Sequence, residues 1–494
     1  MSHRRRLQGP TKRSGEEGYV LLMVLLVLVI VGVMTAVLGS AIAVNQNHVV
    51  RDRSFTKSLA VAEAGLNRYL WMVETGESSE INGFAIAGLD TDGDPLREVV
   101  ALVDPDENLK GTYAIEVTPP SAENVNVSVK VTGISDEDVE PSRTVAANIR
   151  RPSFSEYVLL VDDYVHIGGP IDRVWKGRTH SNKGVEIDTA EINDLITCSQ
   201  RWYGSRDGVF SDVVPKNNVS RELWKYIGVP EIPFAKVTQD FVELNSLATV
   251  SGVTNLPYVT PSPSSAAHGW YIKIVGSRYY IAKVKGEREE WNYSSGLKRG
   301  GYLTYDTPMK GPYDFPVNGV IFVNDSVWVE GKDIDGRLTI AASGQFNNNG
   351  KTASISIVGD LTYAEYDGTV AMGLIAQYDV KIPMYAPMEK AGTMGTRYDT
   401  NVGNVDMRVD AAIIAQKGKE YVNHEGSYGP RRGHLTLFGS VSTLLTPYRV
   451  TVSSNNRDYG GFGRGTNEYD PFMLYSPPPH FPTVGSYQIG EWRE

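Results

Sequence analysis

Three aspartates at alternate positions have a spacing that could bind a metal ion. Asp90, Asp92 and Asp94 stand in the run DTDGD, and alternate carboxylates suit hard, oxygen-seeking cations such as Ca²⁺. The run is not an EF-hand loop, because its glycine comes too early and Ala101 takes the place of the closing glutamate. Short Asp-Gly runs also form plain turns, since Asp caps its own backbone and Gly accepts a positive φ. The sequence leaves both interpretations open.

Arginines and aromatic residues gather in two glycine-rich segments near the C-terminus. Arginine beside aromatic rings could contact phosphates and stack on nucleobases. The alternative is a loop whose aromatic side chains pack along the end of a β domain. The formal net charge of −10 gives no global basicity that would attract nucleic acid. The candidate DNA contacts are Arg431, Arg432, Arg457, Tyr459, Phe462 and Arg464.

Three common signatures of enzyme active sites do not occur in the sequence. The eight histidines are dispersed, and there is no HExxH, no GxSxG and no phosphate loop. His166 and His180 lie near Asp162 and Asp163, but a zinc or hydrolytic site would need a third convergent ligand. Cys198 is the only cysteine, which excludes an intrachain disulfide. We therefore expect no enzyme and no cofactor apart from Ca²⁺; a lyase or hydrolase on a β-helix would instead bring carboxylates or basic residues together on one face.

One apolar stretch organises the rest of the chain. Residues 19–44 contain no formal charge, and about 20 apolar residues suffice to span a bilayer core of about 30 Å. Residues 45–74 continue the helical pattern with an amphipathic face, so we expect one helix of about 84 Å over 19–74. That face is predicted to contain Val50, Phe55, Leu59, Ala62, Leu66, Tyr69 and Val73.

The region around this helix resembles type IV prepilins, most closely the PilX-type minor pilins. The resemblance rests on a basic leader ending SGEEG, an apolar run beginning YVLL and the later segment AVAEAGLNRYL. In that family a prepilin peptidase cuts after a glycine, which implies cleavage after Gly18, with Tyr19 as the new, methylated N-terminus; Gly15 is a second candidate. Met23 or Val20 then occupies the fifth mature position, where the family has a glutamate that neutralises the terminal amine of the adjacent subunit.

The expected fold class is α+β. Residues 1–18 form the leader, and 19–151 form a pilin-like domain in which three antiparallel strands over 113–151 cover the amphipathic half of the helix. Residues 152–494 form a large all-β domain. Apolar strands return there about every 18 residues, which favours a parallel β-solenoid with an inserted subdomain at about 189–316. A β-sandwich is the alternative.

The resemblance implies a non-enzymatic minor pilin at or near a filament tip, which would prime assembly and display its large domain for adhesion. Its implied partners are other pilins and minor pilins, the inner-membrane assembly platform and the prepilin peptidase. Basic residues before the helix predict a cytoplasmic leader, a single membrane span before assembly and an extracytoplasmic C-terminal region at the cell surface. A DNA-binding or surface-binding receptor on a competence pilus, or a component of a type II secretion pseudopilus, is the alternative. The assembly residues are Tyr19, Leu22, Met23, Leu26 and Val44.

Overall fold

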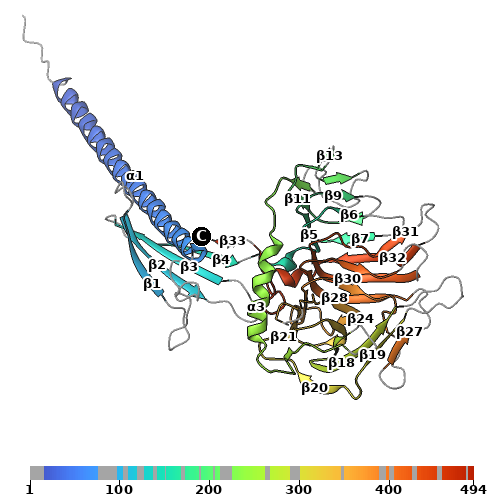
Figure 1. Cartoon of the computed structure of the whole chain (residues 1–494). Coiled ribbons are helices and arrows are strands. Elements are labelled where there is room, and N and C mark those ends of the chain that lie inside the picture. The colour runs from blue at the N-terminus through green and yellow to red at the C-terminus, as the bar shows by residue number, and fades with distance from the viewer. Residues whose placement is uncertain are drawn as a thin grey trace, which may run out of the picture. The chain divides into compact units, whose positions relative to one another are not determined.

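A computed structural model describes most of the chain and divides it into two compact units (Figure 1). Unit 1 consists of residues 1–119, 127–148 and 489–494, and unit 2 of residues 120–126 and 149–488. The described residues are 16–75, 97–103, 110–118, 127–136, 142–150, 152–167, 173–187, 191–203, 206–207, 209–211, 225–261, 268–289, 301–346, 350–388, 396–399, 405–424, 431–452, 459–484 and 488–493.

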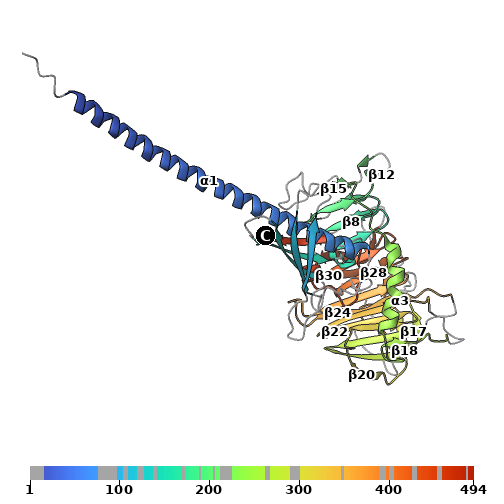
Figure 2. The ribbon, with the colours of Figure 1, turned by 90° about the vertical axis from the view of Figure 1, so that its left-hand side faces the viewer.

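Unit 1 is built on one long helix, α1 (Glu16–Thr75). The helix runs through this whole range without proline, and this confirms the expected single rod. Its first half is exposed throughout, whereas the second half lies on a sheet. Figures 1 and 2 both show the first half of α1 extending beyond that sheet.

The sheet of unit 1 has five strands in the order β1-β2-β3-β4-β33. The pairs β1–β2 and β2–β3 are antiparallel. Three of the strands match those expected from the sequence, and β1 is additional. The C-terminal β33 is also additional: the sequence predicts it to be part of the large domain, but it pairs within the sheet of unit 1. Unit 2 is therefore joined to unit 1 at both of its ends. The strands are β1 (Arg97–Val103), β2 (Lys110–Thr118), β3 (Val127–Ser135), β4 (Ser142–Arg150) and β33 (Gln488–Arg493).

Small residues bring α1 close to the sheet. Ser54 and Ser58 are buried, and both hydroxyls lie 3.2 Å from the Ser135 hydroxyl. A Cβ placed on Gly133 would lie 2.4 Å from the Ser58 carbonyl oxygen, so only glycine allows this approach. Ala62, Leu66 and Tyr69 of the predicted face are buried, whereas Val50 is exposed, Phe55 and Leu59 are half-buried, and the side chain of Val73 lies outside the described set. The buried face is rotated toward the two serines, whose close packing hydrophobic periodicity does not record. The buried face is Ser54, Ser58, Val61, Ala62, Gly65, Leu66 and Tyr69.

Unit 2 contains a long ladder of parallel strands. Each neighbouring pair in the ladder is parallel. From one end to the other the order is β16 (Asn255–Leu256), β21 (Val320–Val323), β23 (Arg337–Ala342), β25 (Ala371–Ala376), β28 (Met407–Ala415), β30 (Arg431–Thr443), β5 (Leu159–Val161), β8 (Thr179–Ser181), β11 (Ile196–Cys198) and β15 (Lys225–Ile227).

A second run of parallel pairs shares β28 and β30 with the first. Its order is β17 (Gly269–Val275), β22 (Val327–Ile334), β24 (Ile355–Tyr363), β28, β30, β32 (Tyr459–Glu468), β7 (Arg173–Lys176) and β10 (Glu191–Ile192). Two short parallel stacks accompany it: β6 (Val165–Ile167), β9 (Val185–Ile187) and β14 (Val209–Ser211), and β24, β26 (Val380–Ile382) and β29 (Glu420–Val422). Antiparallel additions are β18 (Arg278–Arg288), β19 (Gly301–Tyr305), β20 (Lys310–Asp314), β27 (Thr396–Asp399) and β31 (Val450–Val452), and β12 (Trp202–Tyr203) pairs with β13 (Arg206–Asp207).

The chain enters the long ladder in its middle. It runs from β5 through β8 and β11 to β15, forms α3 (Val237–Leu247), resumes at β16 at the opposite end and returns to β30 beside β5. One face of helix α3 packs against β21, with the Phe241 and Phe322 rings 6.5 Å apart. Residues 189–316, expected as a projecting insert, therefore supply strands and a helix to the common core. Their side chains, such as Ile196 and Ile272, pack with the rest of unit 2.

Candidate functional site

The first half of α1 presents an uninterrupted apolar surface. The side chains of Leu22, Met23, Leu26 and Val44 are all more than half exposed. The Thr35 hydroxyl donates to the carbonyl oxygen of Val31 (2.5 Å), so this polar group is satisfied within the helix. Among the described residues, α1 is the one helix long and apolar enough to cross a membrane. Such a surface needs an apolar environment, either a bilayer or a bundle of similar helices.

The expected processing point lies within the first turn of α1. The helix begins at Glu16, so Gly18 and Tyr19 are both helical, and the Tyr19 side chain is exposed. Gly15 lies outside the described residues. Met23, at the fifth position after Gly18, is exposed with its apolar neighbours.

The six candidate DNA contacts do not form one exposed patch. Arg432 and Phe462 lie opposite each other on the neighbouring strands β30 and β32, and both are buried, so neither is available to nucleic acid. Arg464 is exposed. Arg431 and Tyr459 belong to strands, but their side chains fall outside the described set, as does Arg457 entirely. The calcium candidates Asp90, Asp92 and Asp94 also lie outside the described residues.

The histidine pair near Asp162 does not converge on a common site. His180 is buried, with Nδ1 2.8 Å from the Thr197 hydroxyl and Nε2 2.9 Å from the Asn182 side-chain oxygen. Burial lowers the pKa of His180, which favours its neutral form. His166 is exposed. Across the described part of the chain, no three His, Cys, Asp or Glu side chains are placed to hold a metal ion.

A polar outward face, which the sequence did not reveal, lies on four neighbouring strands of unit 2. Beside the core residues Met407, Val409, Leu435 and Leu437, alternate residues over 406–410, 434–438 and 464–468 point outward. Even-numbered positions outside these ranges, such as Arg432 and Phe462, are buried. Parallel register sets the outward residues in rows across the strands. Adjacent members of a row are about 4.8 Å apart. The rows are Asp406–His434–Arg464, Arg408–Thr436–Thr466 and Asp410–Phe438–Glu468, with Asp360 of β24 beside Arg408.

Two adjoining cavities open on this outward face and share Arg408. One, of about 390 Å³, is lined by Asp360, Asp406, Met407, Arg408, His434, Thr436 and Arg464. The other, of about 580 Å³, is lined by Tyr366, Arg408, Phe438, Glu468, Tyr469, Pro471 and Phe472. Together they place charged and aromatic side chains on the two sides of Arg408, and we call this pair of adjoining cavities the mixed groove.

The short helix η4 (Pro471–Leu474) at the edge of the mixed groove is capped by a titratable group. The Asp470 carboxylate accepts the Phe472 N–H at 3.0 Å and is buried. Burial raises the pKa of Asp470 to about 6, and the nearby Asp410 acts in the same direction. Because the folded-state pKa exceeds that of the unfolded chain, the stability from this group is fully present below about pH 4 and is lost as the pH rises through 6.

Asp470→Asn is therefore expected to stabilise unit 2 by about 2 kcal/mol at pH 8, because the amide oxygen keeps the cap without carrying a charge. At pH 4 the variant and the wild type are expected to unfold at the same denaturant concentration. Urea unfolding of the full-length protein at both pH values checks this. A variant less stable than the wild type at pH 8 would show that the ionised carboxylate supports the fold.

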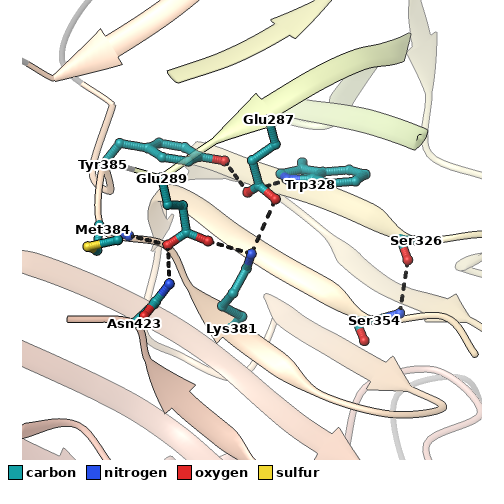
Figure 3. A network of polar contacts seen from close by, with 9 residues as sticks. All are labelled: Glu287, Glu289, Ser326, Trp328, Ser354, Lys381, Met384, Tyr385 and Asn423. Atoms are coloured by element: carbon teal, nitrogen blue, oxygen red, sulfur yellow. Dashed lines mark hydrogen bonds and ion pairs between the residues drawn. The ribbon is translucent and has the colours of Figure 1, made fainter. Parts of the chain in front are cut away.

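A second polar cluster fastens the end of β18 to the neighbouring strands (Figure 3). Lys381 of β26 lies with its Nζ 3.2 Å from Glu287 and 2.7 Å from Glu289. Glu287 also accepts hydrogen bonds from the Tyr385 hydroxyl (2.6 Å) and the Trp328 indole N–H (2.9 Å). Glu289 accepts from the Met384 backbone N–H (3.0 Å) and the Asn423 amide (2.6 Å). Since every carboxylate oxygen has a partner, we interpret this cluster as a structural clamp.

In the part of the chain that the structure describes, these features are one long apolar helix, a small sheet that its second half covers, and a large unit rich in parallel strands. No protein-family model and no curated protein sequence matches the chain. Among solved structures it is similar to the competence-associated pilin ComZ from Thermus thermophilus, at 13% sequence identity over 89% of this chain and 97% of that chain, with a TM-score of 0.28. A TM-score of this size does not establish a common fold, so the likeness carries no weight for function.

Proposed function

We propose that this protein is a pilin-like subunit of a type IV pilus-like filament. The observation that carries the proposal is the continuity of α1: its charge-free, exposed half runs without a break into a half packed on an antiparallel sheet. The exposed half can reside in the membrane before assembly and then exchange lipid for the helices of other pilins. The prepilin peptidase and the inner-membrane assembly platform are then its expected partners.

The position within the filament is proposed to be at or near the tip. Met23 stands where the family has a glutamate that pairs with the terminal amine of an adjacent subunit. A subunit at the tip has no neighbour ahead of it whose amine needs this partner, so it tolerates methionine at this position. Unit 2 contains roughly 340 residues, and a domain of that length has a radius of gyration of about 20 Å. Repetition of so large a unit along a shaft would cause crowding, which a tip position avoids.

We further propose that unit 2 is a parallel β-solenoid displayed for surface binding. Support comes from the long ladder of parallel pairs that runs from β16 to β15, whereas the alternative β-sandwich is built from antiparallel strands. Surface binding is preferred to DNA binding because Arg432 and Phe462 are buried.

N-terminal sequencing of the protein recovered from sheared filaments tests processing and incorporation together. We expect a sequence that begins at Tyr19. A protein that stays in membranes and is absent from filaments would refute the proposal, whereas a start at residue 16 would place the cut after Gly15.

A further inference from the structure

We propose that the mixed groove of unit 2 binds a neutral oligosaccharide. The groove combines partly exposed aromatic rings with fixed carboxylate and guanidinium groups. Convergent polar groups beside an apolar surface are typical of small-molecule sites. The inference names a ligand class for the surface binding proposed above. The role of the groove in surface binding rests on that proposed function, whereas binding of the saccharide itself does not.

Aromatic rings form one end of the groove. Tyr366 and Phe472 are 46% and 41% exposed, and the Tyr366 and Phe438 rings meet edge to face at 5.3 Å. The Arg408 guanidinium lies 5.1 Å from the Tyr366 ring and 5.6 Å from the Phe438 ring. The guanidinium therefore covers one face of the Tyr366 and Phe438 rings. The exposed Phe472 ring offers a face whose partial negative charge attracts the weakly positive C–H groups of a sugar ring.

The Tyr366 ring is held in place from behind. Its hydroxyl donates to the buried Asp410 carboxylate at 2.6 Å, and the same carboxylate accepts the Tyr363 N–H at 3.0 Å. The other Asp410 oxygen lies 2.7 Å from Arg408 Nε. Burial and the hydrogen bond to Asp410 raise the pKa of Tyr366 to about 12, so the phenol remains a fixed donor at neutral pH. A ring fixed in this way loses little entropy when a ligand stacks on it.

Charged groups form the other end of the groove and are fixed by the backbone. One Asp360 oxygen accepts the Arg408 N–H at 2.8 Å, and one Asp406 oxygen accepts the His434 N–H at 2.6 Å. A carboxylate has about four acceptor positions, so both groups keep capacity for a ligand. Arg464 adds guanidinium donors at the exposed side. Sugar hydroxyls, which both donate and accept, match this mixture of acceptors and donors.

The charge of the lining disfavours nucleic acid as the ligand, and the pairing of the strands disfavours an extended peptide. Three acidic groups, Asp360, Asp406 and Glu468, face two basic groups, Arg408 and Arg464, so the lining has no positive excess for a nucleic-acid backbone. Strand β30 lies between β28 and β32, and β32 lies between β30 and β7, so these strands offer no free edge to an extended peptide. A neutral saccharide needs neither a charge excess nor a strand edge.

Binding is tested with full-length protein in a detergent that has no sugar headgroup. The probes are neutral hexasaccharides of glucose, galactose, mannose and N-acetylglucosamine in α and β linkages, measured by saturation-transfer NMR and calorimetry. We expect at least one series to bind. Arg464→Ala and Phe472→Ala are each expected to weaken that binding at least tenfold.

Two exposed residues outside the lining supply matched controls. Arg278→Ala removes an arginine that is 60% exposed, and Tyr378→Ala removes an aromatic ring that is 40% exposed. Both are expected to leave the affinity unchanged. Should Phe472→Ala fail to fold, Arg464→Ala decides the result, because its side chain is exposed.

Three outcomes would overturn the inference: no probe binds at millimolar concentration, the two groove variants bind like the controls, or duplex DNA displaces the saccharide. None of these results depends on filament incorporation. Sequencing of sheared filaments tests the proposed function separately, so failure of one proposal is distinguishable from failure of the other.

Discussion

Lys381→Met is expected to lower the free energy of unfolding of unit 2 by about 3–5 kcal/mol, the usual cost of removing one partner from a buried ion pair. The Lys381, Glu287 and Glu289 side chains are only 17%, 13% and 13% exposed. Burial alone would lower the pKa of Lys381, but the two glutamates outweigh burial and raise it. Without the ammonium group, two carboxylates would face each other with no cation between them.

Urea unfolding of the full-length protein, followed by tryptophan fluorescence, measures the effect because Trp328 belongs to the clamp. Lys285→Met is the matched control: Lys285 pairs with Asp306 at 2.9 Å, but the two side chains are 63% and 47% exposed. An exposed pair contributes about 0–1 kcal/mol, so little change is expected there. Equal effects of the two substitutions would show that the clamp adds no more stability than a surface pair.

The long helix could be predicted from the sequence, but its buried face could not be placed accurately. Apolar composition, helical periodicity and the absence of proline predict α1 from the sequence alone. The packing surface is rotated toward Ser54 and Ser58 because close approach to β3 favours small side chains over large apolar ones. Hydrophobic periodicity gives no weight to a serine, even where the side chain is small enough to be buried and its hydroxyl is hydrogen-bonded to Ser135.

The strands of unit 2 were recognisable, whereas their order was not. Alternation of apolar residues reveals a strand but not its neighbour. Val441 lies opposite Leu159, and this contact between distant parts of the chain leaves no local mark. Strands that follow one another at intervals of about 18 residues are also not neighbours in one ladder. Ile340 lies opposite Leu374, 34 residues later, whereas Ile355 lies opposite Val327 of β22.

The functional face depends on that same long-range pairing. Alternation alone indicates that His434, Thr436 and Phe438 share one side of β30. That Arg408 and Arg464 lie beside them follows only from the register of β28 and β32. The prediction that Arg432 is exposed is wrong, because arginine is rarely buried and residue type alone therefore indicates a surface position.

Gly133→Ala is expected to separate α1 from its sheet and to lower the stability of unit 1 by about 3 kcal/mol, the upper part of the usual cost of overpacking. The added Cβ would lie 2.4 Å from the Ser58 carbonyl oxygen and 2.5 Å from the Ala62 backbone nitrogen. Both atoms belong to the backbone of a regular helix, so they cannot move aside as a flexible side chain would. The helix or β3 must shift as a whole, and the hydrogen bonds of Ser54 and Ser58 with Ser135 would be broken.

Limited proteolysis of the full-length protein in detergent measures this separation, because trypsin can cut after Lys57 and Arg68 once the second half of α1 leaves the sheet. Gly39→Ala is the control: a Cβ there meets no atom within 4 Å, and alanine in place of glycine favours a helix by about 1 kcal/mol. Cleavage of Gly133→Ala at the control rate would mean that the sheet does not hold the helix. Faster cleavage would show that the close contact at Gly133 holds the second half of α1 on the sheet.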